Sequence, residues 1–546
     1  MSAPDQDVPF LAPASATVAP VAQRSDRPSA TGRSSANRAT GVSTRLIPLT
    51  GLRFFAALHI FIFHIAAMPS MEELQKMMQQ AQNASSEKEA VREEQVAAGE
   101  TLANVTDTER AEPTESRSGT APGQNAAKDS TAAVASAVTS DSGQPPAGGG
   151  ANSPEAMAEA MMNRGLYAVL PQPLSWHIQR GYLSTGLFFM LSGFVLAYLY
   201  LDRAGRQTVS NREYWLNRVA RLYPLHITML VFLIPMAVAM LSFMPSNSLW
   251  KIPVSKPVFG VVSGLLSVFL VQAWCPEAAL TWNFATWALS AVAFFYVMFP
   301  TVAAFLQRQS RTTLWTLFWL MPVLNLIPTL LFLWKGEGSA AGFSFQSELV
   351  MRTPLFWLPH FVMAIILCRL FQITRHDMSW VQPGDRTGWR PGLGDLAAAV
   401  ILLISMTPDA VFSRWFGLGE KPPNFILRHG FMCPIYAVFL YEMAQNRGIV
   451  ARLLSHPWCE ALGEASFGIF IFQGPLIFPS MMLFGLISPM LTGVVEQFTT
   501  NPQAVTAAME VIRVTFTVLL VIALALLSVR YFEKPIAKRL KARWGL

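Results

Sequence analysis

Charged side chains are scarce in this sequence. Of its 546 residues, 14% are Asp, Glu, Lys or Arg and 52% are hydrophobic, whereas an average soluble domain carries roughly 25% charged residues. So few charges cannot cover the polar surfaces that a soluble chain of this length needs. The composition therefore excludes most cytosolic enzymes and, despite a formal net charge of +7, nucleic-acid binders. It predicts a polytopic membrane protein.

Cysteine is also rare. The four cysteines each lie more than 25 residues from the next, a spacing that forms neither a set of metal ligands nor a disulfide framework. No metal and no bound cofactor is expected. A continuous apolar signal sequence is missing from residues 1–45, which are rich in Ser, Ala, Pro, Thr and Arg. They predict a disordered cytoplasmic tail, so that the first membrane span acts as the insertion signal.

Long apolar runs are abundant. A membrane-spanning helix needs about 20 apolar residues, and ten runs of this kind predict an all-α bundle of about ten transmembrane helices. An eleventh run, 258–274, has only 17 residues and contains two glycines, which favours a re-entrant or interfacial helix. The ten runs lie near residues 49–68, 182–201, 223–244, 283–306, 313–334, 354–374, 394–413, 424–446, 466–488 and 511–530.

The connections between these runs differ in basic charge. If the N-terminus is cytoplasmic and 258–274 does not cross, the termini and inner connections hold 24 Lys and Arg, and the short outer connections hold 7. Membrane proteins carry such an excess on the cytoplasmic side. The count predicts a multi-pass protein of the inner membrane with both termini in the cytoplasm. A crossing at 258–274 would put the basic C-terminus outside.

One long segment breaks the apolar pattern. Residues 69–165 are rich in Ala, Ser, Gly, Glu and Gln, and from residue 70 onward they hold 15 acidic and 7 basic residues. This composition predicts a low-complexity, disordered insertion on the outer side. It divides the membrane domain into a first span, 46–68, and a remainder, 166–546. The insertion is interpreted as a solvated linker, and an arm that binds a partner or the acceptor is the alternative.

The first span carries two ionisable residues, which are costly inside a bilayer and therefore point to function. Arg53 and His64 are 11 residues apart, three helical turns plus about 20°, so they share one helix face at a distance of roughly 16 Å along the axis. The alternative for Arg53 is an anchor that extends its charge to the cytoplasmic boundary. His59 lies on another face.

A second basic pair follows the second span. Arg218 and Arg221 are three residues apart and lie on one helix face at the predicted cytoplasmic end of the bundle. Guanidinium groups match the geometry of phosphate oxygens. The pair therefore predicts a phosphate site, with a purely topogenic role as the alternative.

In their order along the chain, these pieces resemble the acyltransferase-3 family of integral-membrane acyltransferases, which O-acylate envelope carbohydrates and related acceptors. The resemblance covers residues 46–68 and 175–546. It rests on six blocks: Gly51–Arg53 with His64, Leu187–Phe194, Arg218–Arg221 with Tyr223 and Pro224, Thr286–Pro300, Leu462–Leu476 and Arg530–Pro535.

The resemblance implies transfer of an acyl group from acyl-CoA, with acetyl-CoA favoured, to a hydroxyl of an envelope carbohydrate or a similar acceptor. Arg218 and Arg221 would bind the phosphates of the donor. His64 would act as general base or as a transient nucleophile, and Arg53 would hold an anionic part of the donor or the oxyanion. Further candidates for substrate binding are Trp287, Ser290, Tyr296 and Gln473.

Two positions depart from the family pattern. Val292 stands where the family usually has Glu, and Gln473 stands where it usually has His. Valine cannot ionise, while glutamine still donates and accepts hydrogen bonds. One alternative is therefore a catalytically degenerate member with a binding or regulatory role. The other polar groups left to compensate are His177, His360, His429 and Glu442.

A second alternative is a transporter or a flippase of a lipid-linked sugar. Such proteins often contain internal repeats with broken helices at matching positions. Spans one to five and six to ten show no such correspondence, which disfavours this alternative.

Overall fold

The structure is a computed structural model that describes residues 46–66, 166–202, 204–239, 248–249, 251–334, 345–377, 391–418 and 424–546. These residues are almost entirely helical. The predicted tail, 1–45, and the predicted insertion, 69–165, lie outside the described residues.

The first half of the described chain contains helices and one short β-hairpin. In this hairpin Leu249 pairs with Ile252 in antiparallel register. Its elements are α1 (Ile47–Ala66), α4 (Leu166–Val169), α5 (Gln172–Gln179), η1 (Arg180–Tyr182), α6 (Leu183–Tyr200), α7 (Asn211–Ala239), β1 (Ser248–Leu249), β2 (Ile252–Pro253), α8 (Lys256–Val268), η3 (Gln272–Trp274), η4 (Phe284–Thr286) and α9 (Trp287–Gln307).

The second half forms helices and their connections, with no strand among its described residues. Its elements are α10 (Arg311–Trp334), α11 (Phe345–Arg352), α12 (Pro354–Asp377), α13 (Leu393–Met406), α14 (Asp409–Trp415), α15 (Asn424–Ile426), η6 (Leu427–Phe431), α16 (Cys433–Ala444), α17 (Gly448–Leu454), α18 (Pro457–Glu496), α19 (Pro502–Ser528), η7 (Val529–Glu533) and α20 (Lys534–Arg543).

The predicted all-α membrane bundle is confirmed. Among the described residues, eight helices are long and apolar enough to cross a membrane, and a ninth crossing results if α13 and α14, bent by 99°, count as one. The predicted run 424–446 is broken instead. Gly430 has a φ of 110° within η6, a left-handed conformation that glycine adopts without steric cost. The helix after this break, α16, has only 12 residues.

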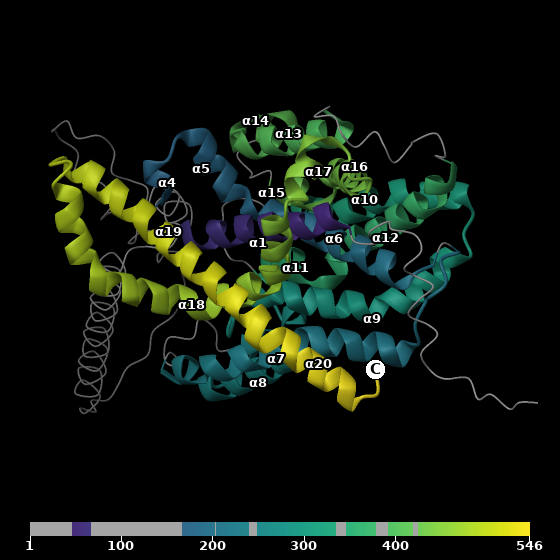
Figure 1. The fold of residues 1–546 in the computed structure, drawn as a ribbon, viewed down its shortest axis with the longest axis horizontal. Coiled ribbons are helices and arrows are strands. Elements are labelled where there is room, and N and C mark those ends of the chain that lie inside the picture. The colour runs from purple at the N-terminus through teal and green to yellow at the C-terminus, as the bar shows by residue number, and fades with distance from the viewer. Residues whose placement is uncertain are drawn as a thin grey trace, which may run out of the picture. The chain divides into compact units, whose positions relative to one another are not determined.

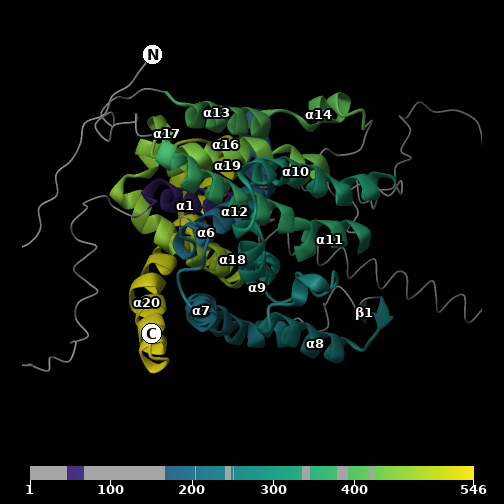
Figure 2. The ribbon, with the colours of Figure 1, turned by 90° about the vertical axis from the view of Figure 1, so that its right-hand side faces the viewer.

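The eleventh apolar run forms a short helix. Helix α8 has 13 residues and is therefore about 20 Å long, too short for a hydrocarbon core of about 30 Å. Figure 2 shows α7 and α8 at the edge of the bundle away from α13. This agrees with the prediction that 258–274 does not cross the membrane by itself.

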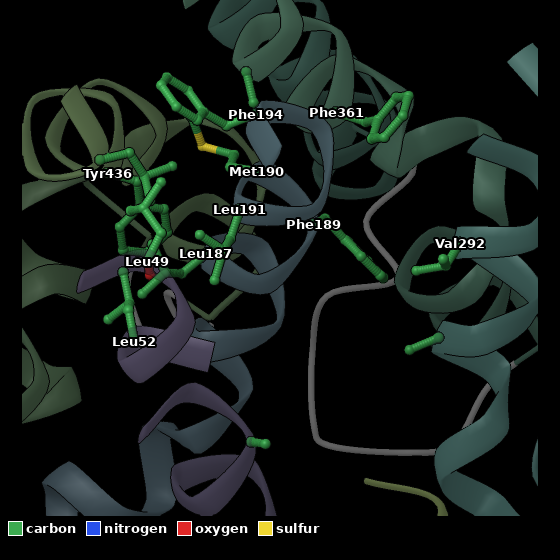
Figure 3. Packing of buried hydrophobic residues seen from close by; sticks show 14 of the residues in the cluster. Leu49, Leu52, Leu187, Phe189, Met190, Leu191, Phe194, Val292, Phe361 and Tyr436 are labelled. Atoms are coloured by element: carbon green, nitrogen blue, oxygen red, sulfur yellow. The ribbon is translucent and has the colours of Figure 1, made fainter. Parts of the chain in front are cut away.

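Helix α6 forms the centre of the core. Its sequence is apolar on all sides, as in a helix that is buried all round, and most of its residues are buried. In Figure 3, Leu187 lies beside Leu49 and Leu52 of α1, whereas Phe189 points away from them, toward the side of Val292. Through these opposite faces α6 positions α1 relative to α9.

Helix α1 packs closely against α18 and α17 through glycines. A Cβ atom at Gly51 would collide with the backbone oxygen of Leu454, and one at Gly463 would collide with the backbone oxygen of Thr50. Small residues allow such close approach between membrane helices. Figure 1 shows α1 inside the bundle and the long helices α18 and α19 extending past its end.

The close contact at Gly463 yields a stability test. Gly463→Ala places a methyl group against the Thr50 backbone, so we expect the free energy of unfolding to fall by about 1–3 kcal/mol. Gly485→Ala is the matched control, because no atom lies within 4 Å of a Cβ atom there. We expect the control to leave stability unchanged or to raise it slightly, since alanine favours the helix by up to about 1 kcal/mol. Thermal unfolding in detergent measures both; equal effects would contradict the described packing.

Candidate active site

A cavity of about 340 Å³ lies among α1, α6, α7, α9, α18 and the C-terminal segment of η7 and α20. Arg53 of α1 and the pair Arg218 and Arg221 of α7 all line it. Three of the predicted basic residues, which come from two separate sequence blocks, therefore share one space. Tyr296 of α9 and Val292 line the same cavity.

The beginning of α7 explains where the arginine pair lies. The side chain of Ser210 accepts a hydrogen bond from the backbone N–H of Glu213 at 3.1 Å, as an N-cap residue does. This cap starts the helix at Asn211, so that Arg218 and Arg221 lie two to three turns later, on the face toward the cavity.

The cavity is strongly basic. Five of its lining residues are Arg or Lys, namely Arg53, Arg218, Arg221, Lys534 and Lys541, and one, Glu533, is acidic. Because low-dielectric walls strengthen the field of such a cluster, the cavity attracts anions. It suits a ligand that carries more than one phosphate group.

Aromatic rings hold Arg218 in place. Its Nη2 donates a hydrogen bond to the hydroxyl of Tyr200 at 2.6 Å, and its guanidinium carbon lies 4.9 Å from the ring centroid of Tyr200 and 5.5 Å from that of Tyr296. Such contacts between a cation and ring faces stabilise a desolvated guanidinium. Its Nε is buried and makes no hydrogen bond to the described residues.

Glu533 supplies the carboxylate of the cavity. Its Oε2 lies 3.7 Å from Nη1 of Arg221, and its Oε1 accepts a hydrogen bond from Ser528 at 3.2 Å. Val292, at the position where the family usually has Glu, faces the same cavity. The acidic group that α9 lacks is thus present on a different element, at the end of η7. Glu533 lies in the last sequence block that resembles the family, where its spacing predicted no role for it.

His64 does not line this cavity. Its Nδ1 lies 2.8 Å from Oε1 of Gln473, and Nε2 of Gln473 donates to the backbone oxygen of Phe470 at 2.9 Å. Phe470 is a lining residue of the cavity. The imidazole and the basic cavity are therefore connected through one turn of α18.

The amide of Gln473 determines which nitrogen of His64 carries the proton. Because its NH₂ group is used by Phe470, its oxygen faces His64 and accepts the Nδ1 proton. This leaves Nε2 as the nitrogen with the free lone pair. The ring of His64 also meets the ring of Phe284 edge to face, with centroids 4.8 Å apart.

The remaining predicted residues on α9 lie elsewhere. Trp287 packs against Phe189 and Trp357, at centroid distances of 6.2 and 6.1 Å. Ser290 is fully buried, and its hydroxyl makes no hydrogen bond to the described residues. The structure does not bring either residue to the basic cavity.

Asn283, which directly precedes η4, was not predicted from the sequence as a residue of the site. Its Nδ2 donates to the backbone oxygen of Ile471 at 3.0 Å, and its Oδ1 lies against Gly474. That oxygen is buried and has no hydrogen-bond partner among the described residues. Asn283 thus borders Gln473 with an unused acceptor. A lone asparagine in a connection gave no sequence signal.

The four polar residues that could compensate for Val292 and Gln473 lie in more than one place away from the cavity. The side chain of Asn325 contacts the ring of His360, and Nδ1 of His429 lies 3.4 Å from Oδ1 of Asn325. His177 contacts the hydroxyl of Ser405 at 2.7 Å, and Glu442 lies against Gly394. None of these residues lines the basic cavity.

The fold and the site define a multi-pass membrane protein with an internal, positively charged cavity, which one turn of α18 separates from the half-buried imidazole of His64. The profile of the acyltransferase-3 family, described as "Acyltransferase domain", matches residues 160–530. The chain therefore belongs to this family. Helix α1, with Arg53 and His64, lies outside the matched residues but within the bundle.

A curated relative is the protein named Acyltransferase MdmB of Streptomyces mycarofaciens. It is 34% identical over 141 residues, which are 25% of this chain and 32% of the relative. The matched part of the chain thus spans about a third of the length of that relative. No solved structure matches the chain.

Proposed function

We propose that this protein is an O-acyltransferase that moves an acyl group from acyl-CoA, with acetyl-CoA as the favoured donor, to a hydroxyl of an envelope carbohydrate or a similar acceptor. The observation that carries the proposal is the basic cavity beside the His64–Gln473 pair in a chain of an acyltransferase family. The cavity supports an anionic donor, and the imidazole supports activation of a hydroxyl.

The orientation that fits this function places the cavity mouth in the cytoplasm, where CoA is made available. Nη2 of Arg212, in the first turn of α7, donates to the backbone oxygen of Trp544 at 3.2 Å. The start of α7 and the end of α20 therefore lie on one side of the bundle. Both are rich in basic residues, which favours the cytoplasmic side of the inner membrane.

In this proposal the arginines bind the donor. Arg218 and Arg221 hold its pyrophosphate, since both face the cavity and both guanidinium groups have N–H donors for phosphate oxygens. Arg53 lies roughly 16 Å from His64 along α1. That distance assigns Arg53 to an anionic or polar part of the donor rather than to the reacting carbonyl.

The chemistry takes place at His64. Its Nε2 accepts the proton of the acceptor hydroxyl, and the hydroxyl oxygen forms a bond to the thioester carbonyl carbon. The carbon–sulfur bond then breaks, and the proton passes from His64 to the thiolate, which leaves as CoA. Gln473 holds the ring with Nδ1 protonated throughout. A glutamine is sufficient for this task because it orients the base without itself transferring a proton.

We expect His64→Ala to lower the rate of acyl transfer by at least about 100-fold, the usual contribution of a positioned general base. The measurement is transfer of radiolabelled acetyl groups from acetyl-CoA by purified protein. His59→Gln is the control, because His59 lies on another face of α1 and contacts Ser184. Undiminished transfer by His64→Ala would remove His64 from the mechanism. Movement of an unmodified sugar without acyl transfer would instead indicate a transporter.

A second prediction concerns Gln473. Gln473→Leu removes the acceptor of the Nδ1 proton, so we expect kcat to fall by at least about tenfold while KM for the donor stays unchanged. Gln473→His restores the residue usual in the family and should keep most of the activity. Full activity of Gln473→Leu would show that the orientation of the ring does not depend on this hydrogen bond.

A third prediction concerns the donor. We expect the double substitution Arg218→Ala with Arg221→Ala to raise KM for acyl-CoA about 10- to 100-fold, the scale of lost charge-assisted hydrogen bonds, and to reduce kcat much less. Steady-state kinetics with varied acyl-CoA measures both constants. Arg539→Ala, on an exposed face of α20, is the control for loss of charge. An unchanged KM in the double variant would leave the pair with a topogenic role only.

A further inference from the structure

The C-terminal helix α20 has two basic faces with different surroundings. Lys534, Ala537 and Lys541 line the cavity, and their spacing of three and four residues places them on one face. Arg539 lies on the opposite face and is exposed. Lys538, four residues after Lys534 and three before Lys541, lies beside the cavity face, is exposed and does not line the cavity. Lys541 also lies beyond the last sequence block that resembles the family, so its place on the cavity wall emerges only from the fold.

The two lysines of the cavity face differ in their partners. Nζ of Lys534 donates to Oε2 of Glu464 at 2.7 Å, which neutralises its charge locally. Lys541 is half-buried and forms no ion pair with the described residues. Its ammonium group is therefore the basic group of α20 that is available to an anionic ligand in the cavity.

We call the end of the cavity beside the first turn of α7 and the end of α20 its mouth, because the proposed orientation places this end in the cytoplasm. Lys541 lies nearer to this end than the arginine pair. Trp544, three residues after Lys541, contacts Arg212 in the first turn of α7. Arg218 and Arg221 follow Arg212 by six and nine residues, about 9 and 14 Å farther along α7. A ligand that extends from the mouth toward His64 therefore meets Lys541 first and the arginine pair next.

We infer that Lys541 binds the 3′-phosphate on the ribose of the CoA donor and thereby selects 3′-phosphorylated over unphosphorylated donors. This inference rests on the proposed donor. In CoA the thioester and the nucleoside lie at opposite ends, and the pyrophosphate lies between them. If the thioester points to His64 and the pyrophosphate to Arg218 and Arg221, the 3′-phosphate comes to the mouth, where Lys541 lies.

The test compares CoA with dephospho-CoA, which lacks only the 3′-phosphate, in binding to the purified full-length protein by isothermal titration calorimetry. We expect the wild type to bind CoA about tenfold more tightly, the scale of one charge-assisted contact. Lys541→Ala should lose this preference while its affinity for dephospho-CoA stays unchanged, which also shows that the variant is folded. Lys541→Arg should keep the preference. Arg539→Ala, on the opposite and exposed face of the same helix, is the matched control and should keep it too.

Other results overturn the inference. If Lys541→Ala weakens the binding of CoA and of dephospho-CoA equally, the lysine acts only through general electrostatic attraction. If the preference for CoA is unchanged, another group binds the 3′-phosphate. Loss of the preference in Arg539→Ala as well would mean that the charge of α20 acts as a whole. If the wild type binds both ligands equally, the 3′-phosphate is not recognised, although the proposed CoA donor stands. If it binds neither ligand, the donor itself is wrong.

Discussion

The cost of placing guanidinium groups inside a membrane bundle governs the arrangement of this protein. Arg53, Arg218 and Arg221 all face one cavity, and each charge there must be stabilised by nearby groups or by a ligand. Tyr200 and Tyr296 supply ring faces to Arg218, and Glu533 supplies a carboxylate to Arg221. These partners come from α6, α9 and η7. Their convergence explains why helices distant in sequence must pack around one point, and it leaves an excess of positive charge that a polyanionic donor would neutralise.

The arrangement separates binding from chemistry. The basic cavity and His64 lie at different depths of the bundle, and Phe470 and Gln473 connect them through a single turn of α18. A donor held by its phosphates at one end would present its thioester at the other, where His64 and the unused acceptor of Asn283 lie close to Gln473. In the proposed mechanism only the part of CoA between the pyrophosphate and the thioester would pass from the basic cavity to His64. A water-filled channel across the membrane is therefore not required.

Much of the fold was predictable because its signals are local. Apolar run length located most of the crossing helices, and helical spacing paired Arg218 with Arg221, which both line the cavity. The same spacing paired Arg53 with His64, but Arg53 lines the cavity and His64 does not. The break at Gly430 was not predictable, since an apolar run does not reveal where a backbone turns left-handed. Contacts between distant segments could not be predicted from local sequence patterns either. Gln473 contacts His64 although 409 residues separate them, and Glu533 lines the cavity although it lies near the C-terminus. Trp287 and Ser290 followed the family block, but the rotation of α9 turns them into the core, whereas Tyr296 faces the cavity.

The distance in sequence between α1 and α18 has a consequence for how the chain is made. The partner of His64 is synthesised 409 residues after it, and at about 5–20 residues per second this takes roughly 20–80 s. During that interval α1 lies in the membrane while His64 lacks Gln473 and Gly51 lacks its neighbour Leu454 on α17. Assembly of the site is therefore a late event of biogenesis, completed only when the end of the polypeptide arrives.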